Sequence, residues 1–112
     1  MKKPTGLQLT EQEWHIVSAI IQQLLADYDV WAFGSRVKGT AKPFSDLDLA
    51  VITSTPLPIS RQAEISEAFT ESALPWKVDV VDWATTPEAF RNIIMQHSIV
   101  LHNTDNPPKK QA

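Results

Sequence analysis

Charged and apolar residues alternate in one short segment of this chain, and that alternation constrains the fold more than any other feature. The segment reads Asp46-Leu47-Asp48-Leu49-Ala50-Val51. Residues two apart in an extended strand point to the same side of it, so the two aspartates share one face and the leucines and the valine share the other. The alternation predicts a strand over residues 47–53, with an apolar face in the core and an acidic face open to water.

Short apolar runs predict three further strands, at residues 30–33, 77–83 and 99–101. Helical segments separate these strands, and residues 36–39 have room for a single helical turn only. The order of helices and strands predicts an α/β (α+β) fold, in which a small mixed β-sheet is flanked by helices.

Capping residues and apolar spacing predict where the three longer helices begin. The first begins at a capping box of Thr10 and Glu13, and we expect Ser60 to cap the second. The last opens at Thr85 or Thr86, just ahead of a proline. Its apolar face is expected to carry Phe90, Ile93, Ile94 and His97.

The chain has 112 residues, enough for one small domain, which we expect to span residues 1–102 and to leave a flexible polar tail at residues 103–112. Its net charge of −3 disfavours strong binding to bulk nucleic acid, because such binding needs an excess of basic residues. The absence of cysteine excludes disulfides and thiolate metal sites and fits a reducing compartment. No apolar run is long enough to cross a membrane and no signal peptide is present, so the sequence predicts a cytoplasmic protein.

Two isoleucines, Ile16 and Ile20, add a second apolar strip to the first predicted helix. One interpretation is that a thin domain buries this helix deeply. The other is that the extra strip contacts another chain. The spacing of the residues is compatible with both.

A glycine–serine pair, Gly34 and Ser35, ends the first predicted strand. Glycine lets the backbone approach a ligand closely, and serine adds a hydroxyl donor. Arg36 and Lys38 follow as candidate partners for phosphate. The alternating aspartates suit Mg²⁺ that is held jointly with phosphate oxygens. Alone, the glycine–serine pair does not distinguish a binding site from an ordinary turn, and the aspartate pattern is more often a solvated strand face.

The two patterns together are more specific than either alone. Gly34-Ser35, followed after ten residues by Asp46-Leu47-Asp48, resembles the nucleotidyltransferase signature of the DNA polymerase β superfamily. The longer match over residues 31–51 resembles the minimal nucleotidyltransferases of that superfamily (the MNT group). The resemblance implies a polymerase β-like palm fold and metal-assisted transfer of a nucleoside monophosphate, with ATP as the donor.

The resemblance also implies a third carboxylate on a neighbouring strand, and residues 77–83 offer two candidates. Asp79 stands within the apolar run, as the family's third acid does. Asp82 stands near the end of the run, where a turn or a helix cap would explain it. The two are three residues apart and therefore face opposite sides of a regular strand. We predict that Asp79 is the third acid.

A role for each site residue follows from the same resemblance. The predicted catalytic and metal-binding residues are Asp46, Asp48 and Asp79. Two Mg²⁺ ions would assist the reaction, one on the phosphates of ATP and one beside the acceptor hydroxyl. The predicted nucleotide-binding residues are Gly34, Ser35, Arg36 and Lys38.

Minimal nucleotidyltransferases pair with helical HEPN-family proteins, and such pairs commonly act as toxin and antitoxin. The resemblance therefore implies a HEPN-type partner whose hydroxyl accepts AMP and which is neutralised by that transfer. Only the polar tail follows Leu101, so we expect the nucleotide site to stand open on one side until a partner completes it. The alternative is a non-catalytic module that binds its partner and blocks it by contact. Three intact acids favour the enzyme.

The histidines and two tryptophans are weaker candidates for function. The histidines, at positions 15, 97 and 102, show no metal-ligand spacing, and we expect His97 to be a core or rim residue. Trp76 and Trp83 flank the third predicted strand. They are placed to stack on a base, although aromatic residues of so small a domain usually belong to its core.

Overall fold

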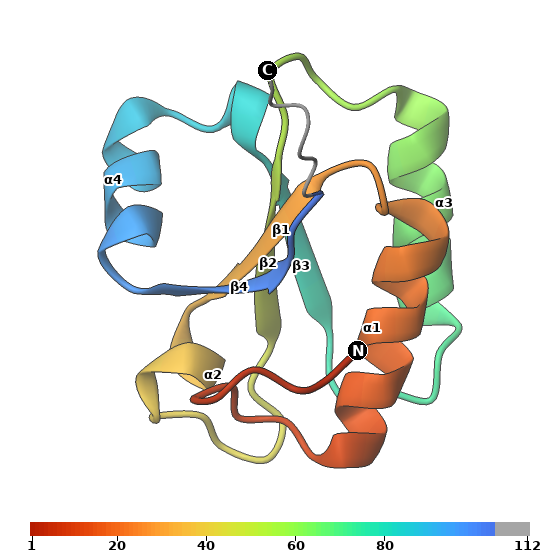
Figure 1. The fold of residues 1–112 in the computed structure, drawn as a ribbon, viewed down its shortest axis with the longest axis vertical. Helices are drawn as coiled ribbons and strands as arrows, with labels where there is room; N and C mark the ends of the chain where they lie inside the picture. Colours follow the sequence, from red (N-terminus) through yellow and green to blue (C-terminus); the bar gives the residue numbers. More distant parts are fainter. Residues whose placement is uncertain (105–112) are drawn as a thin grey trace.

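A four-stranded sheet in the order β3-β2-β1-β4 forms the centre of the computed structural model, which describes residues 1–104 (Figure 1). The strands are β1 (Asp29–Phe33), β2 (Leu47–Ile52), β3 (Val78–Asp82) and β4 (Ser98–His102). Strand β1 runs antiparallel to both of its neighbours, whereas β2 and β3 are parallel and joined through a helix. The mixed sheet confirms the predicted fold class.

Helices lie on both faces of the sheet. Helices α1 (Glu11–Leu24) and α3 (Ile59–Thr70) cover one face, and α4 (Glu88–Gln96) covers part of the other (Figure 1). The single turn α2 (Ser35–Lys38) follows β1, and a short 3₁₀ helix, η1 (Trp83–Thr85), follows β3.

The two faces of β2 differ as its alternation predicts. Its apolar side chains are fully buried in the core between the sheet and helices α1 and α3; they are Leu47, Leu49 and Val51. On the other face, Ala50 and Ile52 pack with Ile94 of α4. Asp48 lies on that same face but nearer the start of the strand. Helix α4 therefore leaves the acidic end of this face open.

The predicted capping box begins α1. The Glu13 backbone N–H donates to Thr10 Oγ1 over 3.0 Å, and the Thr10 N–H donates to Glu13 Oε1 over 2.9 Å. These two bonds satisfy N–H groups that a free helix end leaves without partners.

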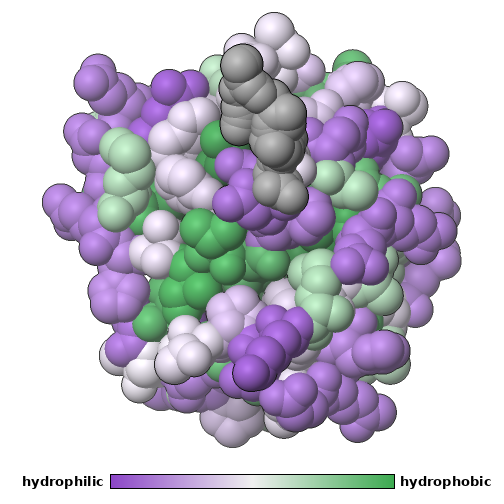
Figure 2. All heavy atoms as spheres, viewed as in Figure 1, coloured by the Kyte–Doolittle hydropathy of each residue, from purple (hydrophilic) through white to green (hydrophobic). Residues whose placement is uncertain are grey.

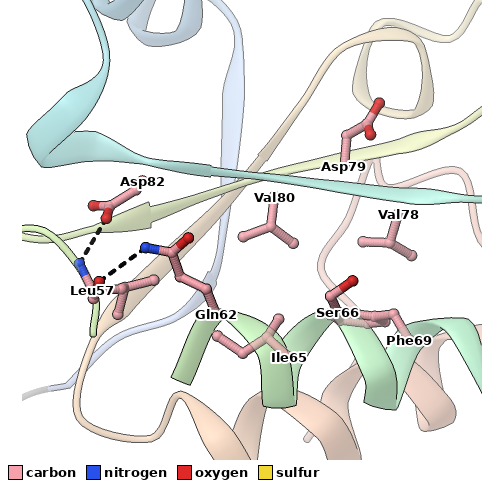
Figure 3. A pocket seen from close by; sticks show the side chains of 9 residues that line it. All are labelled: Leu57, Gln62, Ile65, Ser66, Phe69, Val78, Asp79, Val80 and Asp82. Carbon is pink, nitrogen blue, oxygen red and sulfur yellow. Dashed lines mark hydrogen bonds between the residues drawn. The ribbon is translucent and has the colours of Figure 1, made fainter. Parts of the chain in front are cut away.

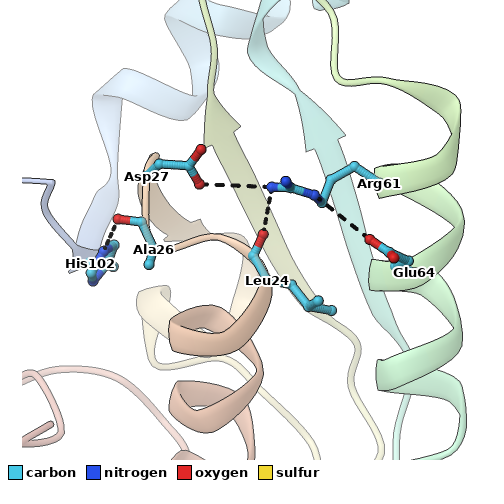
Figure 4. Close-up of polar contacts among 6 residues, drawn as sticks. All are labelled: Leu24, Ala26, Asp27, Arg61, Glu64 and His102. Atoms are coloured by element: carbon cyan, nitrogen blue, oxygen red, sulfur yellow. Dashed lines mark hydrogen bonds and ion pairs between the residues drawn. The ribbon is translucent and has the colours of Figure 1, made fainter.

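Arg61 of α3 holds the far end of α1 (Figure 4). Its guanidinium donates to the Leu24 carbonyl over 2.9 Å and lies 3.8 Å from the carboxylates of Asp27 and Glu64. Exposed ion pairs contribute little to stability, so the hydrogen bond to the helix end is the more important contact.

The start of α3 differs from the prediction. Ser60 is exposed and does not cap the helix; α3 begins at Ile59, after Pro58. The chain is already fixed just before this point, because the Leu57 N–H donates to the Asp82 carboxylate over 2.7 Å. Pro58 is the N-cap residue, and its ring fixes the backbone φ just before the helix.

The start of α4 also differs from the prediction. The helix begins at Glu88, after Pro87, and neither preceding threonine caps it. Both threonine hydroxyls instead donate to the Asp82 carbonyl, Thr85 over 3.1 Å and Thr86 over 2.7 Å. These hydroxyls secure the turn after β3, so they are not available as helix caps.

One interpretation of the second apolar strip predicted exposed apolar surface on α1, but the strip is not exposed. Ile20 is buried in the core and Ile16 packs against it. Large apolar side chains are exposed instead on α4 and β4, among them Ile93, Met95 and Val100. Figure 2 shows apolar surface gathered near the middle of the face that the edge strand β4 presents to the viewer.

The described chain extends slightly beyond the predicted end of the domain. The Thr104 backbone N–H donates to Asp29 Oδ1 over 2.8 Å. Residues 105–112, most of the predicted tail, lie outside the described residues. Within residues 1–104, no helix combines the length and the apolar character needed to cross a membrane.

Candidate active site

Two carboxylates from neighbouring strands meet on the open part of the sheet. Asp48 of β2 pairs in register with Asp79 of β3. Adjacent strands are about 4.8 Å apart, and paired residues of parallel strands point to the same face. Figure 3 shows Asp79 directed away from α3, while Val78 and Val80 point toward that helix. Asp46 lies just before β2, so the three predicted acids gather at one end of the sheet.

Gly34 lies directly beside Asp48. The preceding residue, Phe33, pairs with Asp48 across the antiparallel β1–β2 ladder. The backbone of Gly34 has φ +83° and ψ −160°, a combination that is essentially restricted to glycine. A Cβ atom at this position would overlap Asp48 Oδ2. Glycine is therefore needed both for the backbone conformation and for the approach of the carboxylate.

The environment of Asp48 disfavours its charged form. Burial, followed by the charges of Asp79 and Asp46, raises the pKa of the Asp48 carboxyl to about 6. A cation placed among the three acids would oppose all of these effects, because it offsets both the lost hydration and the repulsion.

This raised pKa predicts how stability depends on pH. In the unfolded chain Asp48 loses its proton near its ordinary pKa of 3.8, whereas in the folded protein it keeps the proton up to about 6. The folded state binds more protons between these values, so stability falls as the pH rises through that window and the cost is complete above it. Urea unfolding at several pH values measures the effect. The stability of the Asp48→Asn variant relative to wild type should rise by about 1 kcal/mol from pH 4 to pH 7, a size that allows for solvent screening. Parallel profiles for the two proteins would contradict the assignment.

A cavity of about 300 Å³ adjoins Asp48. Its lining includes Gly34, Asp48 and Lys38, so it brings together three of the residues that the sequence predicted. Ser35 follows Gly34 at the start of α2. Phe90 and Ile93 of α4 and His97, the residue after that helix, also line the cavity.

Arg36 does not lie in this cavity, contrary to the prediction that it contacts phosphate. Its side chain is buried, and its guanidinium donates to backbone carbonyls of four residues: Gln8, Lys42, Pro43 and Ser45. The guanidinium also stacks on the ring of Trp76, 4.4 Å from its centroid. Arg36 thus holds the loop before β2 in place, and through it the position of Asp46.

Asp82 is occupied by structural contacts, as its place near the end of the strand suggested. Its carboxylate accepts hydrogen bonds from the Thr53 hydroxyl and from the backbone N–H groups of Leu57 and Ala84. Figure 3 shows Asp82 turned toward Leu57, beside a second cavity of about 310 Å³ between α3 and β3. The contacts join the end of β2, the start of α3 and η1.

Substituting Asp82 by Asn should therefore affect stability much more than chemistry. An amide keeps one acceptor oxygen but replaces the other with a donor that faces an N–H or a hydroxyl. We expect the free energy of unfolding to fall by about 1–2 kcal/mol. Urea unfolding measures this loss, and nucleotide binding at a temperature where the variant stays folded should remain within twofold of wild type. A folded variant with no nucleotide binding would instead place Asp82 in the site.

The remaining candidates lie in packing roles. Trp76 is buried beneath the Arg36 guanidinium. Trp83 packs edge-on against Trp31, with ring centroids 5.3 Å apart. His97 is exposed at the rim, where Nε2 lies 3.1 Å from the Val37 carbonyl oxygen. The expected apolar face of the last helix is only partly buried: Ile94 is enclosed, whereas Phe90 and Ile93 border the cavity. No sequence signal separated these two residues from the core.

The donor set suits Mg²⁺, a hard cation that prefers carboxylate oxygens. Within residues 1–104, no three acidic or histidine side chains stand close enough to hold a metal ion by themselves. Mg²⁺ is usually bound in such sites by one or two carboxylates, with phosphate oxygens and water as the other ligands. The arrangement of Asp46, Asp48 and Asp79 therefore fits a metal that binds together with a nucleotide.

A helix-flanked mixed sheet that presents paired acids beside a Gly-Ser turn is the architecture of a nucleotidyltransferase palm. The family model "Polymerase beta, Nucleotidyltransferase" matches residues 19–107. The chain belongs to this nucleotidyltransferase family, which confirms the resemblance seen in the sequence.

Individual proteins that resemble this chain in sequence or fold support the same family. The chain is 51% identical over 104 residues to a Haemophilus influenzae protein described as a probable protein adenylyltransferase MntA, and the match covers 93% of this chain and 91% of that protein. A crystal structure of a toxin–antitoxin with AMP-PNP has a similar fold, with a TM-score of 0.68 and 22% identity over 82% of this chain and 74% of that one. A Shewanella oneidensis complex of an MNT antitoxin with a tri-AMPylated HEPN toxin contains a chain with a TM-score of 0.63 and 18% identity, over 86% and 74% of the two chains.

Proposed function

We propose that this protein transfers AMP from ATP to a hydroxyl group of a helical HEPN-type partner and thereby neutralises it, as the antitoxin of a toxin–antitoxin pair. The observation that carries the proposal is the pairing of Asp48 with Asp79, with Gly34 beside Asp48 and with Asp48 and Lys38 both lining one cavity. The 51% identity to a probable protein adenylyltransferase supports the same reaction and a protein as the acceptor.

The reaction requires a defined task from each residue. Asp46, Asp48 and Asp79 would hold Mg²⁺, which neutralises charge on the triphosphate when it is bound. Lys38 contacts phosphate oxygens, and Gly34 lets the chain approach them without a side chain. A bond forms between the acceptor oxygen and the α-phosphorus of ATP while the bond from that phosphorus to the bridging oxygen breaks, so pyrophosphate leaves. Asp79, the most exposed of the three acids, accepts the proton of the acceptor hydroxyl.

A cytoplasmic location is part of the proposal. It is supported by the proposed use of ATP and by the absence of cysteine from the chain.

Co-expression with a small helical protein encoded beside this one, followed by intact mass measurement, tests the proposal. We expect the partner to gain one or more AMP units with the wild-type protein and none with the Asp46→Asn variant. The Asp82→Asn variant is the matched control, because it also removes an acidic charge but leaves the three proposed catalytic acids in place. A different outcome would identify a non-catalytic binding module. In that outcome the partner forms a stable complex but stays unmodified, and the Asp46→Asn variant neutralises it as well as wild type does.

A further inference from the structure

The cavity beside Asp48 has two chemically different walls. Gly34, Asp48 and Lys38 supply a polar and charged part of its lining, while Phe90 and Ile93 of α4 supply an apolar part, which we call the apolar wall. Its volume of about 300 Å³ is within the range of small-molecule sites, which typically combine an apolar lining with a few polar groups.

The apolar wall is open to solvent, and Ile94 is the only buried residue of α4. Phe90 is 36% exposed and Ile93 is 55% exposed, whereas Ile94, the residue after Ile93, is fully buried against the sheet. A single exposed apolar residue is ordinary in a soluble protein. Phe90 and Ile93 differ from such a residue in their position, because both line the cavity that Asp48 also lines.

Phe90 is held in a fixed position relative to the acids. Its ring meets that of Phe33 edge-on, with centroids 5.7 Å apart and an interplanar angle of 80°. Phe33 is the strand partner of Asp48 and the residue before Gly34. The same short stretch of β1 therefore positions the aromatic wall and the phosphate side of the cavity.

We propose that Phe90 and Ile93 form the binding wall for the base of the nucleoside triphosphate. This inference rests on the proposed function and adds to it the part of the site that contacts the base. The charged wall suits the phosphates and metal, and the base is the flat, weakly polar end of the same substrate. Aromatic side chains bind bases by stacking, and the energy depends little on which base is present. Trp76 and Trp83, the aromatic residues singled out in the sequence, are occupied by packing with Arg36 and Trp31.

Calorimetric titration with two ligands tests the wall directly. In the presence of Mg²⁺, wild type and the Phe90→Ala variant are titrated with ATP and with inorganic triphosphate, which has no base. We expect Phe90→Ala to weaken ATP binding about tenfold and to leave triphosphate binding within twofold. The Ile93→Ser variant should also bind ATP more weakly, with triphosphate binding little changed. Met95→Ala is the matched control, because Met95 is 53% exposed on the same helix and does not line the cavity. Its affinities for both ligands should equal those of wild type.

Different failures of this experiment have different meanings. Unchanged ATP affinity in both wall variants, or an equal loss for ATP and triphosphate, overturns the base-binding wall while the proposed function stands. If wild type binds neither ligand, the proposed function fails and the wall fails with it. Thermal unfolding checks that each variant is folded. Should Phe90→Ala not fold, Phe90→Leu keeps an apolar contact with Phe33 but has no aromatic face, and the same selective loss of ATP affinity is expected from it.

Discussion

Replacing Asp48 by Asn is expected to reduce nucleotidyl transfer by roughly 10³-fold or more while the protein stays folded. An amide is a poor ligand for Mg²⁺ and carries no charge to offset that of the metal. The fold should survive because burial and two neighbouring acids already disfavour the charge of Asp48. Single-turnover transfer assays and thermal unfolding near pH 7 measure the two effects, and the unfolding temperature should equal or exceed that of wild type.

The Asp79→Asn variant extends this prediction to the strand partner of Asp48. It should lose activity to a similar degree without loss of stability, since Asp79 is exposed. Asp82→Asn is the control from the same strand, with the opposite pattern of lower stability and retained activity. Retained transfer in Asp48→Asn would remove the metal-ligand assignment. Loss of transfer only in Asp82→Asn would show that the wrong face of β3 had been chosen.

Substituting Gly34 by Ala is expected to cost about 2–4 kcal/mol of stability and roughly 10²-fold in activity. Alanine does not tolerate the backbone conformation of Gly34, and its Cβ would overlap the carboxylate of Asp48. Either the backbone or the carboxylate must move, and both belong to the proposed site. Urea unfolding measures the stability loss, and transfer assays on the folded fraction measure the activity loss.

Gly39→Ala is the matched control for this substitution. Gly39 also has a positive φ, of +78°, but a Cβ there would have no atom within 4 Å. The Gly39→Ala variant should lose only about 1 kcal/mol of stability, because only the left-handed backbone opposes it, and its activity should be unchanged. Equal effects at the two glycines would mean that backbone strain, and not contact with Asp48, explains the loss at Gly34.

The sequence predicted the features of this protein that depend on local geometry. Alternation placed Asp48 opposite the buried side of β2, because side chains in a strand alternate between faces whatever surrounds it. The capping box of α1 formed as predicted, because its donors and acceptors lie within three residues of each other. Helix starts at Ile59 and Glu88 were predicted wrongly, because Asp82, far away in sequence or across a turn, fixes the chain before each of them.

Tertiary structure decided which charged and apolar side chains are available for function. Arg36 lies two residues after Gly34, yet carbonyls from the distant Gln8 and from the loop before β2 converge on its guanidinium, and its side chain is buried. Phe90 and Ile93 follow the same helical spacing as a core face, and only the placement of α4 over half of the sheet leaves them beside the cavity. Periodicity in a sequence determines which residues share a face, because it depends on the backbone alone. Which part of that face is covered depends on contacts between distant segments, and those contacts form only when the chain folds.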